Sequence, residues 1–210
     1  MKKSNLEKYW NKYYLKKIKF KESTFAKFTY NFLKKKKIHN IIDIGCGNGR
    51  DSIYFANKGF DVTGIDISKT VILLNSNKLE KNLRFIKFDI EKNKIKKKFD
   101  IIYSRFFLHA INEKAEVKLM KIINSIKKNS YIFFEFRNDR DEIFKKFNNI
   151  KHNQVVEFEK GHYRRIINTK KFIENFTKFT KTKLIYLKSS KNLSVHKNDN
   201  PNLTRVIFKS

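Results

Sequence analysis

Residues 41–52 read Ile-Ile-Asp-Ile-Gly-Cys-Gly-Asn-Gly-Arg-Asp-Ser, and this stretch decides the fold. Residues 41–44 have the character of a buried strand, glycines follow at alternate positions, and residues 50–57 suit a helix. Because glycine lacks a Cβ atom, closely spaced glycines let the backbone turn sharply between the strand and the helix. The N–H groups at the start of such a helix favour a negatively charged group. The stretch therefore predicts a loop that binds a nucleotide cofactor.

The spacing of the glycines distinguishes between classes of cofactor loop. A dinucleotide-binding loop reads G-x-G-x-x-G/A, whereas this chain has Gly45, Gly47 and Gly49, with Asp43 two positions before the first glycine. No Lys-Ser or Lys-Thr pair follows the loop, which excludes a P-loop phosphate site. The D-x-G-x-G-x-G arrangement resembles motif I of the class I S-adenosylmethionine-dependent methyltransferases. The resemblance implies that S-adenosyl-L-methionine is the cofactor.

The rest of the chain alternates between expected helices and strands. Further strands are expected at residues 61–66, 83–88, 99–105, 131–137, 183–188 and 204–208. This alternation predicts an α/β fold built on a doubly wound parallel sheet. The resemblance implies a seven-stranded, Rossmann-like sheet whose last strand is antiparallel to the others.

The length of 210 residues suits a single domain. We expect four parts within it, each recognisable from its residue pattern. These are a helical N-terminal arm (1–38), a cofactor-binding core (39–137), a substrate-shaping insertion (138–168), and a C-terminal helix with two strands (169–210).

Further cofactor residues are expected where the strands end. Asp66 closes the second strand, where a carboxylate can accept hydrogen bonds from both hydroxyls of a ribose; capping the next helix is its structural alternative. The resemblance implies that Asp89 faces the adenine amino group, that Ile90 lies under the ring, and that the tip of the fourth strand lies beside the methionine part. The expected cofactor residues are Asp43, Gly45, Cys46, Gly47, Gly49, Asp66, Ile67, Asp89, Ile90, Ser104 and Arg105.

Aromatic residues gather in the N-terminal arm. Residues 4–20 predict an amphipathic helix with Tyr9, Trp10 and Tyr13 on one face. These aromatic side chains either pack on the edge of the sheet or form a lid over the cofactor. In the second case Tyr13 and Tyr14 face the methyl acceptor.

The acceptor site is expected beside the insertion, where arginines replace the lysines that dominate the chain. A guanidinium group binds phosphate or carboxylate through two parallel hydrogen bonds, which an ammonium group cannot do. We expect Arg137, Tyr163, Arg164 and Arg165 to bind an anionic small-molecule acceptor. Adjacent residues on a strand point in opposite directions, so only one of Arg164 and Arg165 needs to face it.

Two histidines are candidate general bases. His109 follows the fourth strand, and His162 lies in the insertion. A base is needed only where the acceptor must lose a proton, as a hydroxyl group must. A structural role is the alternative for both histidines.

The composition limits the partners and the compartment. The net charge is +29, but eight of the 49 basic residues are arginines, which indicates a lysine bias over the whole chain rather than a nucleic-acid site. No His, Cys and carboxylate cluster has metal-ligand spacing, so no metal is expected. The single Cys46 and the lack of an apolar run of about 18–20 residues predict a cytoplasmic protein without a membrane span.

Outside the core motifs, the sequence resembles the small methyltransferases encoded among bacterial capsule and surface-polysaccharide genes. The resemblance rests on Tyr13-Tyr14 and on residues 23–26, 161–165 and 189–205. It implies O-methylation of a sugar or phosphate-bearing precursor, including the O-methyl phosphoramidate kind. The alternatives are an RNA or DNA methyltransferase that uses the basic N-terminal arm, and a cofactor-binding protein without catalysis.

Overall fold

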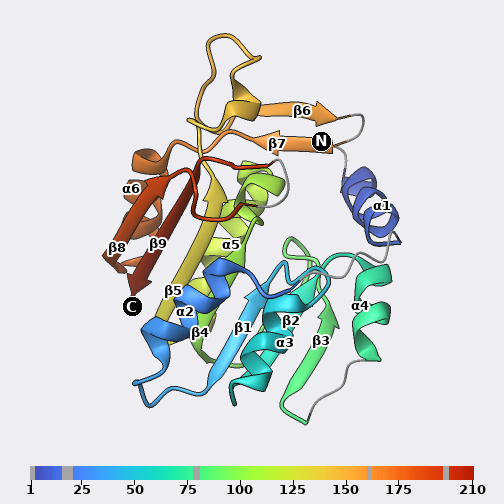
Figure 1. The fold of residues 1–210 in the computed structure, drawn as a ribbon, viewed down its shortest axis with the longest axis vertical. Coiled ribbons are helices and arrows are strands. Elements are labelled where there is room, and N and C mark those ends of the chain that lie inside the picture. The colour runs from blue at the N-terminus through green and yellow to red at the C-terminus, as the bar shows by residue number, and fades with distance from the viewer. Residues whose placement is uncertain (1–2, 16–20, 78–80, 160–161, 196–198) are drawn as a thin grey trace.

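The computed structural model describes residues 3–15, 21–77, 81–159, 162–195 and 199–210 (Figure 1). Its α-helices are α1 (Lys3–Tyr14), α2 (Thr24–Leu33), α3 (Arg50–Asn57), α4 (Lys69–Ser76), α5 (Glu113–Ile126) and α6 (Thr169–Thr180). Its strands are β1 (Asn40–Ile44), β2 (Asp61–Asp66), β3 (Leu83–Lys87), β4 (Phe99–Arg105), β5 (Lys127–Arg137), β6 (Val155–Glu159), β7 (His162–Arg165), β8 (Lys183–Ser190) and β9 (Leu203–Lys209). Two short 3₁₀ turns, Leu108–Ala110 and Glu142–Phe144, complete the described elements.

Within the described residues, seven strands form one sheet in the order β3-β2-β1-β4-β5-β9-β8. Strands β1 to β5 pair in parallel, and β9 lies antiparallel between β5 and β8. The order reverses at β1, which lies between β2 and β4, so the sheet is doubly wound. This confirms the fold expected from the sequence, including the antiparallel last strand.

The two faces of the sheet carry separate parts of the core. Because side chains alternate along a strand, Ile41 faces the layer with Phe25 of α2 and Phe55 of α3. Its neighbour Ile42 packs in the other layer, with Ile123 of α5. Helices therefore cover both faces of the sheet. The glycine loop lies at the carboxyl end of β1, where ligands bind in such sheets.

The insertion contains structure that the sequence reading did not resolve. Strands β6 and β7 form an antiparallel hairpin, with Val156 opposite Arg164. The hairpin packs on a small separate core of Phe144, Val156 and Ile166. Of these three residues only Val156 lies in β6 or β7, so the two strands show no clear apolar alternation. In Figure 1 the hairpin and α1 both lie at the edge where the parallel strands end.

One expected helix differs from the structure. The helix expected over residues 4–20 is seen as α1, which ends at Tyr14, and residues 16–20 lie outside the described part of the chain. Between β4 and α5 the chain makes a single 3₁₀ turn, Leu108–Ala110. Phe106 has a positive φ of 56°, which interrupts a regular helix, and Asn112 accepts a hydrogen bond from the N–H of Ala115 (2.8 Å) at the start of α5.

Arg165 fastens the hairpin to the rest of the fold. Its guanidinium group is buried, forms an ion pair with Glu116 of α5, and donates to the carbonyl oxygens of Leu108 (3.0 Å) and Ile111 (2.9 Å). A buried charge is costly unless it is paired and hydrogen-bonded, and here both conditions are met. Arg165 therefore sets the position of β7.

Removal of this side chain should destabilise the protein strongly. Arg165→Met leaves the Glu116 carboxylate buried without its partner, and we expect a loss of about 3–5 kcal/mol in the free energy of unfolding. Urea denaturation followed by circular dichroism measures the loss. Arg140→Met, at an exposed position, should change stability by less than about 0.5 kcal/mol. The double variant Glu116→Leu/Arg165→Met should recover most of the loss, and an additive effect of the two changes would contradict the pairing.

Candidate functional site

A cavity of about 1010 Å³ opens at the carboxyl ends of β1, β2 and β4. This is the upper end of the range of roughly 300–1,000 Å³ that is typical of small-molecule sites. Its wall comes from the glycine loop, from the loops after β2, β3 and β4, from α1 and from β7. The cavity lies where ligands bind in open α/β sheets, beside the reversal of strand order.

The glycine loop approaches its neighbours too closely for side chains. A Cβ atom on Gly45 (φ +76°) would lie 2.5 Å from the Phe107 ring, and one on Gly47 (φ +52°) would lie 2.5 Å from the Tyr14 hydroxyl. Both glycines line the cavity. Gly49 does not; a Cβ atom there would lie 2.6 Å from the Phe85 ring, so this glycine allows α3 to pack closely on the sheet.

Two buried aspartates stand at the ends of β1 and β2. Asp66 accepts hydrogen bonds from the N–H groups of Gly47 (3.0 Å) and Ser68 (2.9 Å), which orient its carboxylate at the cavity wall. Burial raises the pKa of Asp66 to about 6. Burial also raises the pKa of Asp43 to about 8, although the hydroxyl of Ser52 donates to its carboxylate (2.6 Å) and opposes the shift.

Of the other residues expected at strand ends, most line the cavity. Cys46, Ile67, Asp89, Ile90 and Arg105 form part of its wall. Ser104 does not line it: its buried hydroxyl donates to the carbonyl oxygen of Ile44 (2.8 Å) and ties β4 to β1. Ser104 and Gly49 are thus the two expected cofactor residues that do not line the cavity.

Helix α1 covers the cavity with aromatic side chains. Tyr9, Trp10, Tyr13 and Tyr14 all line it, which is the lid arrangement rather than packing on the edge of the sheet. Tyr9 stacks on the ring of His162 at 4.5 Å between centroids, and Trp10 meets the same ring edge-on at 5.7 Å. The helix therefore contacts the hairpin across the mouth of the cavity.

The two candidate bases occupy different environments. His162 lines the cavity, and burial together with the positive charges of Arg164 and Arg137 lowers its pKa to about 3. His109 lies behind the wall, fully buried, and its Nδ1 accepts from the N–H of Arg137 (3.2 Å). Burial lowers the pKa of His109 well below its usual value. His109 is therefore not part of the cavity wall.

The arginines expected at the acceptor site are not equivalent. Arg164 lines the cavity, whereas Arg165 and Tyr163 lie outside the cavity wall. The alternation expected along the strand is observed, because Arg165 points instead to Glu116 in the core. Arg137 reaches the cavity, but one terminal nitrogen donates to Asp141 (3.0 Å) and the other is paired with Asp199.

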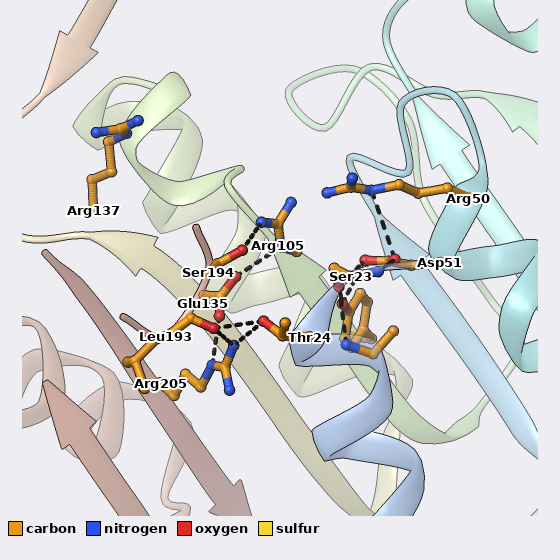
Figure 2. Close-up of polar contacts among 12 residues, drawn as sticks. Ser23, Thr24, Arg50, Asp51, Arg105, Glu135, Arg137, Leu193, Ser194 and Arg205 are labelled. Carbon is orange, nitrogen blue, oxygen red and sulfur yellow. Dashed lines mark hydrogen bonds and ion pairs between the residues drawn. The ribbon is translucent and has the colours of Figure 1, made fainter. Parts of the chain in front are cut away.

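Several cavity residues were missed by the sequence reading. Arg50 follows the glycine loop directly and lines the cavity together with its neighbour Asp51. The buried carboxylate of Asp51 accepts from the N–H of Ser23 (2.7 Å), the Ser23 hydroxyl (2.7 Å) and the Tyr103 hydroxyl (2.7 Å). These contacts join α3 to the start of α2 beside the cavity (Figure 2). The scarcity of arginine in a lysine-rich chain was the available signal for Arg50.

No group of His, Cys, Asp and Glu side chains in the described ranges is arranged to hold a metal ion. In the same residues, no helix is both long enough and apolar enough to cross a bilayer.

Comparison with known families agrees with this geometry. The sequence profile described as "Methyltransferase domain" matches residues 35–202, which include the glycine loop and most of the seven-stranded sheet. The chain belongs to the methyltransferase domain family. S-Adenosylmethionine is therefore the cofactor whose fit to the cavity matters.

Curated relatives match less than half of this chain. A probable S-adenosyl-L-methionine-dependent methyltransferase, TehB, from Haemophilus influenzae is 31% identical over 84 residues, which are 39% of this chain and 29% of the relative. Malonyl-[acyl-carrier protein] O-methyltransferase 2 from Ilyobacter polytropus is 37% identical over 82 residues, covering 37% of this chain and 32% of the relative. These matches thus cover about a third of the relatives' length.

Solved structures show the same fold over most of the chain. A S-adenosylmethionine-dependent methyltransferase from Methanosarcina mazei superposes with a TM-score of 0.72 and 18% identity, covering 87% of this chain and 96% of the other. The glycopeptide N-methyltransferase MtfA in complex with S-adenosylmethionine gives 0.67 and 10% identity, covering 90% and 94%. At these identities the likeness concerns the fold.

The side chains of the cavity fit S-adenosylmethionine. Asp66 offers carboxylate oxygens to ribose hydroxyls, and the apolar Ile67 and Ile90 with the acid Asp89 suit an adenine ring and its amino group. The turn at Gly45 and Gly47 keeps Cβ atoms out of the cavity. The wall also carries arginines, which suit the carboxylate of the methionine part.

The raised pKa of Asp66 predicts a pH dependence of cofactor binding. Hydroxyl groups bind the ionised carboxylate best, so affinity for S-adenosylhomocysteine should be constant above the pKa and fall as the pH decreases through about 6. Near pH 5 we expect about 10-fold weaker binding than at neutral pH, measured by calorimetry. Asp43, with a pKa of about 8, stays protonated over this range and contributes no step. Asp66→Asn should bind more weakly and lose the dependence; a variant with full affinity would contradict the assignment.

Proposed function

We propose that the protein transfers the methyl group of S-adenosylmethionine to an oxygen of a small anionic acceptor that carries a sugar or a phosphate. The observation that supports this most directly is the polarity of the cavity wall. Asp66 and Asp89 line the part at the ends of β2 and β3, whereas Arg105 and Arg164 line the part near β4 and β7, and the guanidinium group of Arg50 is directed towards Arg105 (Figure 2). The first part suits a nucleoside and the second an anion.

The chain's own residues have three tasks in this reaction. Bound S-adenosylmethionine supplies a methyl group that is already activated by a positively charged sulfur atom, so the protein mainly has to hold the acceptor in line with it. Asp66 and the glycine loop hold the nucleoside, Arg164 orients the anion, and the α1 aromatics, including Trp10 and Tyr14, exclude water.

The histidines argue for an acceptor oxygen that is ionised before it reacts. His162 lines the cavity, but a pKa of about 3 makes it a weak base at neutral pH. His109 is enclosed behind the wall. A phosphate or carboxylate oxygen carries its negative charge at neutral pH and needs no base, whereas an alcohol does. An anionic oxygen also matches the arginines of the wall.

The biological setting is part of the proposal. The resemblance to methyltransferases of capsule and surface-polysaccharide genes supports an acceptor among the precursors of such polymers, with O-methyl phosphoramidate as a specific product. The relative from Ilyobacter polytropus, named as an O-methyltransferase, supports transfer to oxygen. The chain has one cysteine, the buried Cys46, and therefore no internal disulfide, which suits the reducing cytoplasm.

A labelling experiment tests the function. The protein is incubated with methyl-labelled S-adenosylmethionine and, separately, with sugar nucleotides, phosphorylated sugars, phosphoramidate esters, RNA and DNA. We expect label to enter a small phosphate-bearing compound as a methyl ester of its phosphate group, which resists mild alkali. Label that enters only RNA or DNA would contradict the proposal. The proposal would also be contradicted if the protein binds the cofactor but transfers no label to any of these acceptors.

Arg164 should contribute to acceptor binding through its planar guanidinium group. Arg164→Lys keeps the charge but loses the two-pronged hydrogen bonding, so kcat/KM for the acceptor should fall by about 10- to 100-fold, the scale of a charged hydrogen bond. Affinity for S-adenosylhomocysteine should stay unchanged in calorimetry. The matched control Arg140→Lys, at an exposed position, should behave as the unaltered protein. Unchanged turnover in Arg164→Lys would exclude Arg164 from the acceptor site.

A nucleic-acid substrate is the second candidate, and the net charge of +29 is the observation that favours it. Binding through surface lysines releases counterions, so the logarithm of affinity should fall by roughly 0.7–0.9 per phosphate contact for each tenfold rise in salt. We expect weak, sequence-independent RNA binding that disappears near physiological salt, measured by fluorescence anisotropy. Tight binding to one structured RNA at that salt would favour the second candidate over the first.

A further inference from the structure

Arg137, at the end of β5, is held in one orientation by buried contacts. Its Nη1 donates to both carboxylate oxygens of Asp141 (3.1 and 3.0 Å), and its backbone N–H donates to Nδ1 of His109 (3.2 Å). The Asp141 side chain is only 1% exposed, so this ion pair is shielded from water. Figure 2 shows the Arg137 guanidinium group apart from the polar contacts around Arg105. These contacts fix the guanidinium group without using its second terminal nitrogen, Nη2.

Nη2 of Arg137 is paired with a second carboxylate, that of Asp199, which lies between β8 and β9 in the sequence. In contrast to Asp141, the Asp199 side chain is 53% exposed. Among the residues that the structure describes, Arg137 is the one hydrogen-bond donor to the Asp199 carboxylate. Ion pairs that water can reach contribute little to stability. The Arg137–Asp199 pair is therefore the weaker of the two.

The weaker pair lies on the wall of the cavity, because Arg137 and Asp199 both line it. The positive charges of Arg164 and Arg137 both lower the pKa of His162, so the two guanidinium groups lie near the same ring. Arg164 is the residue that orients the anion in the proposed reaction. Arg137 thus presents a second guanidinium group on the acceptor side of the cavity, and a carboxylate of the protein itself occupies it.

Two carboxylates share the single positive charge of Arg137. Burial raises the pKa of Asp141, the charge of Arg137 opposes this shift, and the negative charge of Asp199 adds to it. A further anion bound beside Nη2 while Asp199 stays in place would increase the repulsion. An incoming anion therefore binds Arg137 best by replacing the exposed carboxylate, while the buried Asp141 keeps the guanidinium group in position.

We propose that Asp199 is an internal counter-ion of Arg137 and that the anionic group of the methyl acceptor replaces it when the acceptor binds. The identity of that group rests on the proposed function. The apparent affinity for any anion is reduced in proportion to the fraction of molecules in which Asp199 has left Arg137. Simple anions, which make few other contacts, are then bound too weakly to occupy the site. Asp199 is thus a specificity-determining residue that favours a larger acceptor.

Inorganic phosphate tests the replacement, because it has the anionic chemistry expected of the acceptor and no other part. It is titrated by calorimetry into protein saturated with S-adenosylhomocysteine, which fills the cofactor's part of the cavity. The variants are Asp199→Asn and Asp199→Ala, the second of which cannot keep an oxygen on Arg137. Glu22→Gln is the matched control, because it removes one negative charge from another side chain of the cavity wall, which is paired with Lys27 instead of an arginine.

We expect both Asp199 variants to bind phosphate about 10-fold more tightly than the unaltered protein, the scale of one competing charged hydrogen bond. Glu22→Gln should stay within about 2-fold of the unaltered protein, since it frees no guanidinium nitrogen. A purely structural role of Asp199 would not raise the affinity for phosphate.

Several results would overturn the proposal. Unchanged or weaker phosphate binding in both Asp199 variants would show that the carboxylate does not compete with the anion. An equal gain in Glu22→Gln would assign the effect to the overall charge of the cavity, and phosphate that binds to none of the proteins would exclude an anion site at Arg137. Failure of S-adenosylhomocysteine to bind the unaltered protein refutes the proposed function instead, and titration of phosphate alone still decides whether Asp199 competes.

Discussion

The close approach of the glycine loop to three aromatic side chains is the constraint on which the cavity depends. Gly45, Gly47 and Gly49 all have positive φ, and a Cβ atom on any of them would meet an aromatic side chain within 2.6 Å. The same loop turns the chain from β1 into α3 and brings the Gly47 N–H to Asp66 at the end of β2. A side chain at any of these three glycines would displace the aromatic residue that it meets, which is Phe107 after β4, Tyr14 of α1 or Phe85 of β3.

Acidic and basic side chains are distributed unevenly around the cavity. The protein stabilises these buried groups in two different ways. At the ends of β1 and β2, burial raises the pKa values of Asp43 and Asp66, so the cost of a buried negative charge is partly avoided by protonation. Arginine cannot lose its charge in this way, and Arg105 is instead paired with Glu135. A ligand with hydroxyls at one end and an anionic group further along complements both parts.

The insertion and the N-terminal helix α1 contact each other beside the cavity, although they are distant in the sequence. Arg165 fastens the hairpin to α5 and the preceding turn, which places His162 of the same strand against Tyr9 and Trp10 of α1. The buried ion pair between Arg165 and Glu116 thus links α5 to the hairpin, and the hairpin in turn contacts α1 at the mouth of the cavity. Variation in the insertion would change this side of the cavity without changing the glycine loop.

The sequence by itself determined the α/β alternation, the glycine loop, the carboxylates at the strand ends and the family. These features are local: an apolar period, a turn without Cβ atoms and the last residue of a strand are all visible in a few neighbouring residues. It also determined that Arg164 and Arg165 point in opposite directions, because side chains alternate along a strand. It could not determine which of the two faces the cavity.

Only the tertiary structure decided the roles that depend on distant partners. Glu116 forms a buried ion pair with Arg165, the carbonyl oxygen of Ile44 accepts a hydrogen bond from the Ser104 hydroxyl, and Glu135 accepts one from Arg105. Each of these partners lies about 30 or more positions away in the chain. The same residue type therefore becomes a structural or a ligand-facing group according to which partner the fold brings beside it, and no local pattern records that choice.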